Sequence, residues 1–291
     1  MIEKEPEIFY KLYPYDFWLN KANMLKSKID SKGSASDDIG ISGYGSDQKR
    51  YQRMLNYELH FTYFQQVEAL FELLFALQKK DDKHIWLYLN NSKWHKNLKK
   101  IEKIATGELN IDSQKVELEN GDKRSFLEWA FYAGIDHKMS KKDLQNTLTK
   151  AKRLIQQAAK DFVDRQSYNA YKHGLRILPL LDNDYLKDER ITEAIGDNDF
   201  SNSFTYLDFE KDGSGFSEIT VSYNPEQDIE RINFMSLLMA NMIRNRRSQF
   251  YKEDTLRFTA FSKLDPVDHI KGAHQRKKLV IEHKLPKRDM F

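Results

Sequence analysis

Long stretches of helical periodicity constrain the fold of this chain more than any other feature of its sequence. Between residues 48 and 80, apolar side chains recur at spacings of three and four residues, which is the period of one helix face. These residues are Leu55, Leu59, Tyr63, Val67, Leu70, Leu74 and Leu77, and Phe61, Phe64, Phe71 and Phe75 widen the apolar surface. A helix that is apolar around so much of its circumference is expected at the centre of a helical bundle.

A second helical pattern follows Ser140. Asp143 lies three residues after this serine, which resembles a capping box at a helix start. Neither proline nor glycine occurs before Gly174, so the pattern predicts one helix of about 34 residues, roughly 50 Å long. Further helices are expected over residues 84–106, over residues 123–135, and from Asn224-Pro225 to about Tyr251, where asparagine suits the N-cap and proline the first helical position.

Strand signals are confined to short segments. Two runs rich in aromatic and β-branched residues flank the turn Lys211-Asp-Gly-Ser-Gly215, which predicts a β-hairpin at about residues 203–223. Residues 107–122 fit either a small hairpin or a loop, and residues 255–262 predict a last short strand. The predicted fold class is therefore mainly α, a helical bundle of about five helices with an inserted β-hairpin.

Domain boundaries are weakly marked in this chain. The clearest loop composition is the stretch rich in glycine and serine at residues 31–47. It lacks the Gly-Lys-Ser/Thr ending of a phosphate-binding loop, so no nucleotide is expected there. We predict a single helical domain over residues 1–265, followed by a basic, weakly ordered tail over residues 266–291.

Composition excludes several classes of chemistry. The chain has no cysteine, which excludes disulfides, thiolate metal sites and cysteine catalysis. No glutamate is followed by a histidine three residues later, as a di-metal carboxylate bundle requires, so neither a metal nor a cofactor is expected. The N-terminus resembles no signal peptide, and no run approaches the roughly 20 apolar residues of a membrane helix. We therefore expect a cytoplasmic protein.

Basic residues cluster in two places although the net charge is only +3. Arg244, Arg246 and Arg247 lie near the end of the last long predicted helix, where they are candidate phosphate-binding residues. The tail carries Lys271, Arg276, Lys277, Lys278, Lys284, Lys287 and Arg288. Both clusters also fit an ordinary solvated surface, and the sequence leaves the two interpretations open.

The best candidate for chemistry lies at the end of the long helix predicted after Ser140. Arg165, Asn169 and His173 are each four residues apart, which places them on one stripe of a helix. A cation, an amide and an imidazole on one stripe suit the binding of a phosphate and the transfer of a proton. The same segment also fits a plain helix end. Lys172 and His173 suit the negative end of the helix dipole, and Gly174 suits the left-handed position beyond it.

The segment Tyr168-Asn-Ala-Tyr-Lys-His-Gly174, at the end of a long helix in a helical bundle, resembles the HEPN superfamily of nucleotide-binding and RNA-cleaving domains. The mark of that family is an arginine, often followed by asparagine, and then a histidine four to six residues further on. Asn169 and His173 match the asparagine and the histidine. Tyr168 occupies the arginine position, and Arg165 lies one turn earlier on the same stripe. The resemblance covers roughly residues 48–176.

The resemblance implies metal-independent RNA cleavage in a bacterial defence or stress system. His173 would act as general acid or base, Arg165 would stabilise charge on the phosphate, and Asn169 would orient the phosphate or the imidazole. Tyr168 and Tyr171 either stack on RNA bases or pack in the core, and Lys172 would help to bind the phosphate. The family commonly pairs two such helices in a homodimer. Because a neutral phenol replaces the family arginine, a non-catalytic RNA-binding member is equally expected, and a protein–protein interaction module is the alternative.

Overall fold

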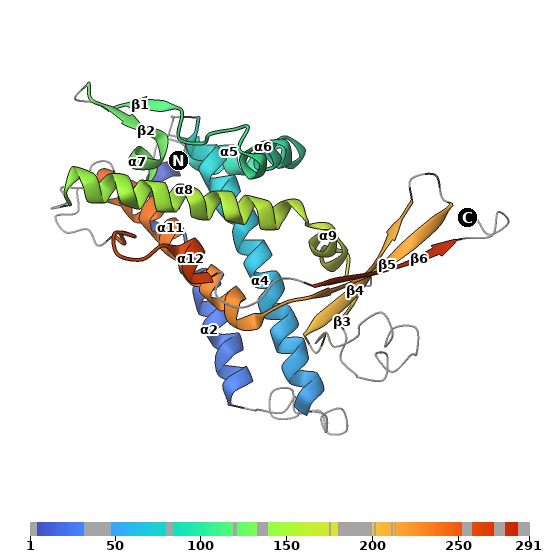
Figure 1. Ribbon diagram of the computed structural model, residues 1–291. Coiled ribbons are helices and arrows are strands. Elements are labelled where there is room, and N and C mark those ends of the chain that lie inside the picture. The colour runs from blue at the N-terminus through green and yellow to red at the C-terminus, as the bar shows by residue number, and fades with distance from the viewer. Residues whose placement is uncertain are drawn as a thin grey trace. The chain divides into compact units, whose positions relative to one another are not determined.

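The chain is mainly α-helical and forms two compact units in the computed structural model (Figure 1). The structure describes residues 5–31, 48–79, 84–118, 121–132, 139–174, 176–179, 200, 202–210, 212, 214–251, 258–270 and 277–284. The first unit, called the helical unit below, comprises Met1–Leu19, Gln65–Asp164 and Glu230–Gly272. The second, called the sheet unit, comprises Asn20–Phe64, Arg165–Ile229 and Ala273–Phe291.

The single domain over residues 1–265 stays a prediction, because the two units are defined by contacts and not by a linker. One boundary lies between Asp164 and Arg165, and three fall inside helices, namely α2 (Phe17–Asp30), α4 (Gln48–Leu77) and α11 (Pro225–Tyr251). The helical period continues across each of these boundaries without a proline, a glycine or a polar linker. A sequence pattern therefore offers no signal for them, because the division arises from contacts between distant segments.

The helical unit is built around the apolar face of α8 (Lys141–Val163). Its buried residues include Leu148, Ala151, Leu154, Ile155, Ala158 and Phe162. Helices α6 (Trp94–Thr106), α7 (Phe126–Phe131) and α12 (Pro266–Ile270) pack against α8, and α1 (Glu5–Leu12) packs against α5 (Ile85–Asn90). The unit also holds a small antiparallel hairpin of β1 (Lys115–Glu117) and β2 (Lys123–Ser125). Strand β1 lies within residues 107–122, where the sequence left a hairpin and a loop open, whereas β2 occupies the predicted start of the helix over residues 123–135.

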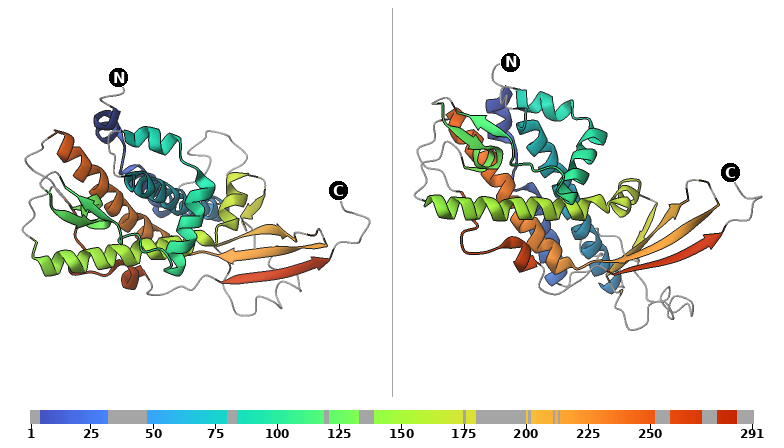
Figure 2. Two further views of the ribbon diagram at one scale, coloured as in Figure 1. Left: turned by 90° about the horizontal axis from the view of Figure 1, so that it is seen from above. Right: turned by 45° about the horizontal axis from the view of Figure 1, so that its top comes forward.

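The sheet unit contains a four-stranded antiparallel sheet in the order β3-β4-β5-β6 (Figures 1 and 2). The strands are β3 (Ile177–Pro179), β4 (Ser203–Phe209), β5 (Gly215–Ser222) and β6 (Lys278–Lys284). Helix α9 (Gln166–Lys172) packs against β3 and β4. The two strands expected near residues 203–223 are β4 and β5, and they form the middle of this larger sheet instead of an isolated insertion.

The prediction of a weakly ordered tail over residues 266–291 is wrong for the residues that the structure describes there. Residues 266–270 form α12, and residues 278–284 form the edge strand β6. The basic composition concealed the alternation of Leu279 and Ile281 with polar neighbours, which is the period of a strand with one half-buried face. The short strand predicted at residues 255–262 is absent from residues 258–262, and residues 255–257 lie outside the described part. Residues 32–47 of the predicted loop also lie outside it.

The long helix predicted from Ser140 to Gly174 is two helices. Helix α8 ends at Val163, Asp164 leaves the helical conformation with ψ 55°, and α9 begins at Gln166. Neither proline nor glycine marks this break, so tertiary packing, and not local propensity, sets it. The helix predicted over residues 84–106 divides in the same way into α5 and α6.

The predicted caps are confirmed by hydrogen bonds. The Asp143 amide donates to Ser140 Oγ at 3.1 Å, and Ser140 Oγ donates to Asp143 Oδ2 at 2.7 Å. Asn224 Oδ1 accepts from the backbone amides of Glu226 and Gln227 at the start of α11. Gly107 and Gly174 adopt the left-handed conformation expected just past a helix, with φ of 82° and 67°.

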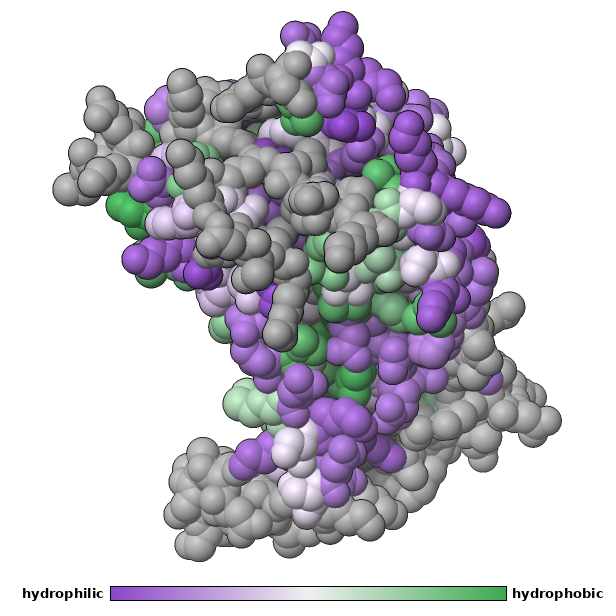
Figure 3. Space-filling model, turned by 90° about the vertical axis from the view of Figure 1, so that its left-hand side faces the viewer, coloured by the Kyte–Doolittle hydropathy of each residue, from purple (hydrophilic) through white to green (hydrophobic). Residues whose placement is uncertain are grey.

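The surface agrees with the strongly polar composition of the chain. Hydrophilic residues cover most of the described part of the face in Figure 3, and the mean hydropathy of the chain is −0.73. Among the helices that the structure describes, none has the length and apolar character needed to cross a membrane.

Candidate functional site

The predicted site residues lie on α9 and keep their common stripe despite the break after α8. Arg165 is the residue before the first turn of α9, and the Asn169 amide donates to its carbonyl oxygen at 2.8 Å. His173 is the residue after the last turn, with φ −91° and ψ 8°. One helical turn therefore separates Arg165 from Asn169, and about one more separates Asn169 from His173.

Solvent reaches most of this stripe. Asn169, Lys172 and His173 are exposed, whereas Arg165 is half-buried. We define these four residues as the α9 face. It presents an amide and an imidazole to solvent, with a guanidinium group at its N-terminal end. The Lys172 ammonium lies over the Tyr168 ring, 4.5 Å from its centroid. This set can donate hydrogen bonds to an anion.

Tyr168 does not belong to this exposed surface. Its side chain is only 2% exposed, and its ring stacks on Phe64 with the centroids 5.7 Å apart. The interpretation of Tyr168 as a base-stacking residue is therefore wrong, and it is a core residue. The reason is its position on α9, because it lies next to the stripe on the side that packs against α4.

Tyr171 is also held by the protein itself. Its ring lies parallel to that of Phe61, with the centroids 4.3 Å apart, and its hydroxyl donates to Glu58 Oε2 at 2.8 Å. Lys21 Nζ donates to the other oxygen of Glu58 at 2.7 Å. Tyr171 therefore anchors α9 to α4 within the sheet unit, which accounts for this side chain without a bound base.

The arginine cluster of α11 belongs to the helical unit and is largely occupied there. Arg246 is 1% exposed, its guanidinium carbon lies 3.7 Å from the centroid of Trp129, and it donates to the Trp129 carbonyl oxygen. Arg244 donates to the Tyr15 hydroxyl at 3.0 Å, and Arg247 is half-buried. The prediction that Arg246 binds phosphate is therefore wrong, because the surrounding elements cover its side of α11.

A buried histidine–carboxylate pair lies in the core of the sheet unit. His60 Nδ1 is 2.7 Å from Asp228 Oδ2, and their side chains are 1% and 0% exposed. The Tyr223 ring stacks on the imidazole at 4.8 Å. Burial, and then the nearby Asp228 carboxylate, raise the pKa of the Tyr223 phenol well above its ordinary value.

His60 lies within the apolar helical pattern of residues 48–80, and no sequence pattern indicates its partner. Asp228 lies in the first turn of α11, where a carboxylate is favoured by the helix dipole alone, so nothing marked it as a partner of a distant histidine. Both side chains are enclosed, so the pair is out of reach of a large substrate. Its evident role is to join α4 to the start of α11 within the sheet unit.

Neither a metal site nor a ligand pocket stands out in the described part of the chain. No group of three or more potential metal-ligating side chains occurs among the described residues. In the helical unit, a cavity of about 180 Å³ lies between the end of α6 and α8. Its lining consists of Ile104, Gly107, Leu109, Asn110, Ile111, Lys152 and Gln156. Pockets for small molecules usually measure about 300–1,000 Å³, so this cavity is small for such a ligand. A second hollow of about 340 Å³ is lined by the polar residues Lys99, Glu102, Lys103, Thr106 and Glu108 and lacks the apolar lining typical of such pockets.

Comparisons with protein-family models, with curated proteins and with solved structures found no match to this chain. An inference about function therefore depends on the chemistry and exposure of the side chains. By these criteria the α9 face is the best candidate, because it combines hydrogen-bond donors, positive charge and an imidazole on an exposed surface.

Proposed function

We propose that this protein is a HEPN-like RNA-binding protein and that the α9 face contacts the RNA backbone. The observation that carries the proposal is the exposure of Asn169, Lys172 and His173 on one short helix. Ammonium and guanidinium groups form charge-assisted hydrogen bonds with phosphate oxygens, and an asparagine amide adds a neutral donor. The bundle of about five helices that this family implies, a homodimeric state and a role in bacterial defence are parts of the same proposal.

Binding is better supported than cleavage by the geometry of α9. For cleavage, His173 would accept a proton from the 2′-hydroxyl or donate one to the leaving oxygen. The family arginine is replaced by Tyr168, which is buried, so Arg165 is the guanidinium on this helix that would stabilise the extra charge on the phosphate. The proposal therefore takes RNA binding as the primary activity and metal-independent cleavage by His173 as its extension.

Fluorescence anisotropy with a labelled structured RNA tests the binding. We expect binding that weakens steeply between about 50 and 200 mM salt, because phosphate contacts release counterions. The double substitution N169A/H173A should weaken binding, and adding Lys172→Glu should weaken it further and reduce the salt dependence. An RNA affinity that none of the three substitutions changes would overturn the proposal.

Incubation of the same RNA in EDTA tests the cleavage. Cleavage by the wild type that is lost in His173→Ala would support acid–base catalysis by this imidazole without a metal ion. Intact RNA, or cleavage that survives the substitution, would restrict the proposal to binding.

A second candidate function is a non-catalytic interaction module that binds a protein partner. The observation in its favour is a group of exposed apolar side chains on the four-stranded sheet. Leu178 is 65% exposed, Leu207 48% and Phe209 61%. A stable complex with a protein partner, with RNA binding absent at physiological salt, would favour this function over the first.

A further inference from the structure

Strand β6 forms one edge of the four-stranded sheet. It pairs with β5 on one side, and no strand among the described residues pairs with its other side. Figure 1 shows it as the last strand of the sheet, beside β5. An edge strand presents a row of backbone donors and acceptors that can pair with a further strand.

The hydrogen-bond pattern shows which backbone groups of β6 point outward. The Ser222 amide donates to the carbonyl oxygen of Lys277 at 2.9 Å, so the polar groups of residue 277 point toward β5. In an antiparallel ladder this direction alternates along the strand. The groups of residues 279, 281 and 283 therefore also point toward β5, and those of Lys278, Val280, Glu282 and Lys284 point away from the sheet.

We propose that two copies of this chain form a homodimer by antiparallel pairing of their β6 strands about a two-fold axis at Val280. In this register the outward groups of Val280 meet those of Val280 in the second copy. Lys278 of each copy lies opposite Glu282 of the other, so opposite charges face each other twice. The outward groups of these three residues then form hydrogen-bonded pairs across the axis, and the two sheets become one continuous sheet.

The side chains on the other face of β6 fit the same register. Leu279 of each copy lies opposite Ile281 of the other, in the closely spaced type of pair where side chains approach most nearly. Both residues are half-buried and pack against Phe200 in their own chain. Pairing would therefore extend an existing apolar cluster across the axis. Lys278, Val280 and Glu282 are exposed on the opposite face, so their side chains are accessible to a second copy.

Charge and the number of pairs favour this register over its neighbours. Outward groups can pair only with outward groups, so the axis can shift to residue 278, 279, 281 or 282. An axis at Lys278 places two lysines opposite each other, and an axis at Leu279 places Lys278 opposite Val280 and leaves Glu282 without an opposite residue in β6. An axis at Ile281 places Lys278 opposite Lys284, and an axis at Glu282 places two glutamates opposite each other. Like charges directly opposite destabilise a strand pair, whereas the axis at Val280 has only opposite or apolar pairs among these positions.

This dimer goes beyond the proposed RNA binding and uses none of its residues. Helix α9 packs against β3 and β4, whereas the pairing occupies the outer side of β6. The proposed function includes a homodimeric state, and this inference gives that state an interface. The test below contains no RNA, so the β6 interface and the RNA contact of the α9 face are tested separately.

Light scattering coupled to size-exclusion chromatography tests the proposal by charge exchange. The wild type should have twice the chain mass of 34.5 kDa. Lys278→Glu and Glu282→Lys should each weaken dimerisation about tenfold or more, because both symmetric charge pairs change from attraction to repulsion. The double variant K278E/E282K should form dimers again, and an equimolar mixture of the two single variants should form heterodimers.

Lys96→Glu is the matched control, since Lys96 is exposed on α6 in the helical unit and the charge change is the same. Circular dichroism confirms that each variant is folded. A monomeric wild type would overturn the proposal. The charged residues of β6 would then serve to prevent pairing with another chain. A dimer that survives Lys278→Glu, or a double variant that stays monomeric, would also overturn it, because the interface would then lie elsewhere.

Discussion

His60 and Asp228 form a polar contact between two fully buried side chains of the sheet unit. Removal of the carboxylate by Asp228→Ala leaves a buried imidazole without this partner. We expect the free energy of unfolding to fall by about 3 kcal/mol, the lower end of the range for breaking a buried pair. Urea denaturation of the wild type and the variant measures this difference.

Glu226→Ala is the control for Asp228→Ala. It removes a carboxylate from the same first turn of α11, but this side chain is 78% exposed and its ion pair with Lys26 lies at 3.6 Å. A surface pair of this kind contributes about 1 kcal/mol or less. Equal effects of the two substitutions would contradict the role given to the buried pair.

Tyr171 tests the division between the anchoring and the exposed residues of α9. Tyr171→Phe removes the hydrogen bond to Glu58 and keeps the ring on Phe61. We expect a loss of about 1 kcal/mol in the free energy of unfolding and an unchanged RNA affinity. A strong loss of RNA affinity, measured by anisotropy beside His173→Ala, would show that the tyrosine hydroxyl belongs to the binding surface.

The sequence could not predict which of the candidate side chains are exposed to solvent. The four-residue spacing correctly grouped Arg165, Asn169 and His173 on one stripe of α9. It could not show that Tyr168 and Arg246 are buried, because a periodic pattern gives the face of a helix but not which other elements cover that face. Asp228 was missed for a related reason, since its partner lies far away in the sequence.

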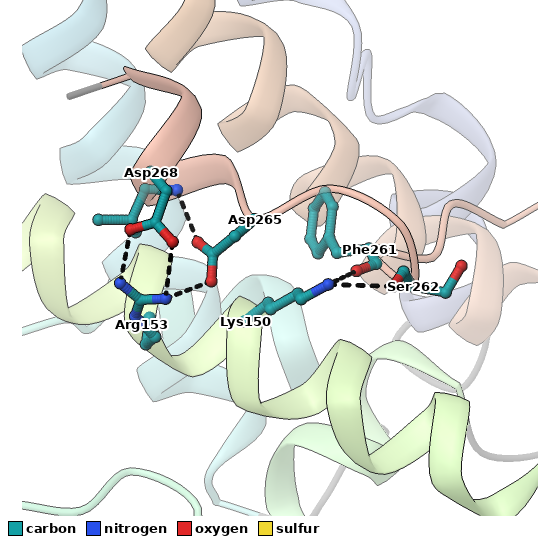
Figure 4. Close-up of polar contacts among 7 residues, drawn as sticks. Lys150, Arg153, Phe261, Ser262, Asp265 and Asp268 are labelled. Carbon is teal, nitrogen blue, oxygen red and sulfur yellow. Dashed lines mark hydrogen bonds and ion pairs between the residues drawn. The ribbon is translucent and has the colours of Figure 1, made fainter. Parts of the chain in front are cut away.

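At the level of single elements, polar contacts of Lys150 and Arg153 on α8 hold the segment around α12 within the helical unit (Figure 4). Lys150 Nζ donates to the carbonyl oxygens of Phe261 and Ser262 at 2.7 and 3.0 Å. Arg153 donates to Asp268 at 2.9 Å and also pairs with Asp265. The segment therefore depends on two cations of α8 in addition to its own apolar contacts.

The double variant K150A/R153A should release this segment without unfolding the protein. Arg153 is 42% exposed, so each of its ion pairs contributes about 1 kcal/mol or less. We expect faster hydrogen–deuterium exchange in residues 258–270 and little change in the core of α8, as measured by mass spectrometry. Lys142→Ala, on the exposed side of the same helix, should have no effect. Unchanged exchange in the double variant would show that apolar packing alone holds the segment.

Helix starts and ends were predicted well where side chains determine them, as at Ser140, Asn224 and Gly174. The break between α8 and α9 was not predicted, because no residue near Asp164 disfavours a helix enough to reveal it. Strand β6 was hidden in a basic segment, and its assignment depends on pairing with β5, which no local pattern shows.

For the whole molecule, buried tyrosines predict a loss of stability at alkaline pH. Burial raises the pKa of Tyr132 in the helical unit and of Tyr223 in the sheet unit above the ordinary value of 10.0. Above about pH 10 the unfolded chain therefore releases protons that the folded protein keeps, and stability falls as pH rises. Below pH 10 this contribution is fully present.

Denaturation midpoints measured between about pH 8 and 11, together with tyrosinate absorbance, check this prediction. The denaturation midpoint should decrease as the pH is raised above 10, and Tyr223→Phe should make this decrease smaller. Ionisation of all tyrosines near pH 10 in the still folded protein would contradict it.

The mainly α class of the molecule followed from its helical periodicity, whereas its division into two units did not. The boundaries inside α4 and α11 depend on contacts between segments far apart in the chain. The sheet was predicted only in its two middle strands, because β4 and β5 are joined by a recognisable turn and their outer neighbours are not.

The central claim, that the α9 face contacts RNA, is tested most directly by NMR of the histidine rings. The chain has eight histidines, and the His173→Ala variant assigns the signal of His173. During titration with RNA, we expect the His173 signal to shift while that of the buried His60 stays unchanged. RNA binding that leaves the His173 signal unmoved, or no binding at low salt, would contradict the claim.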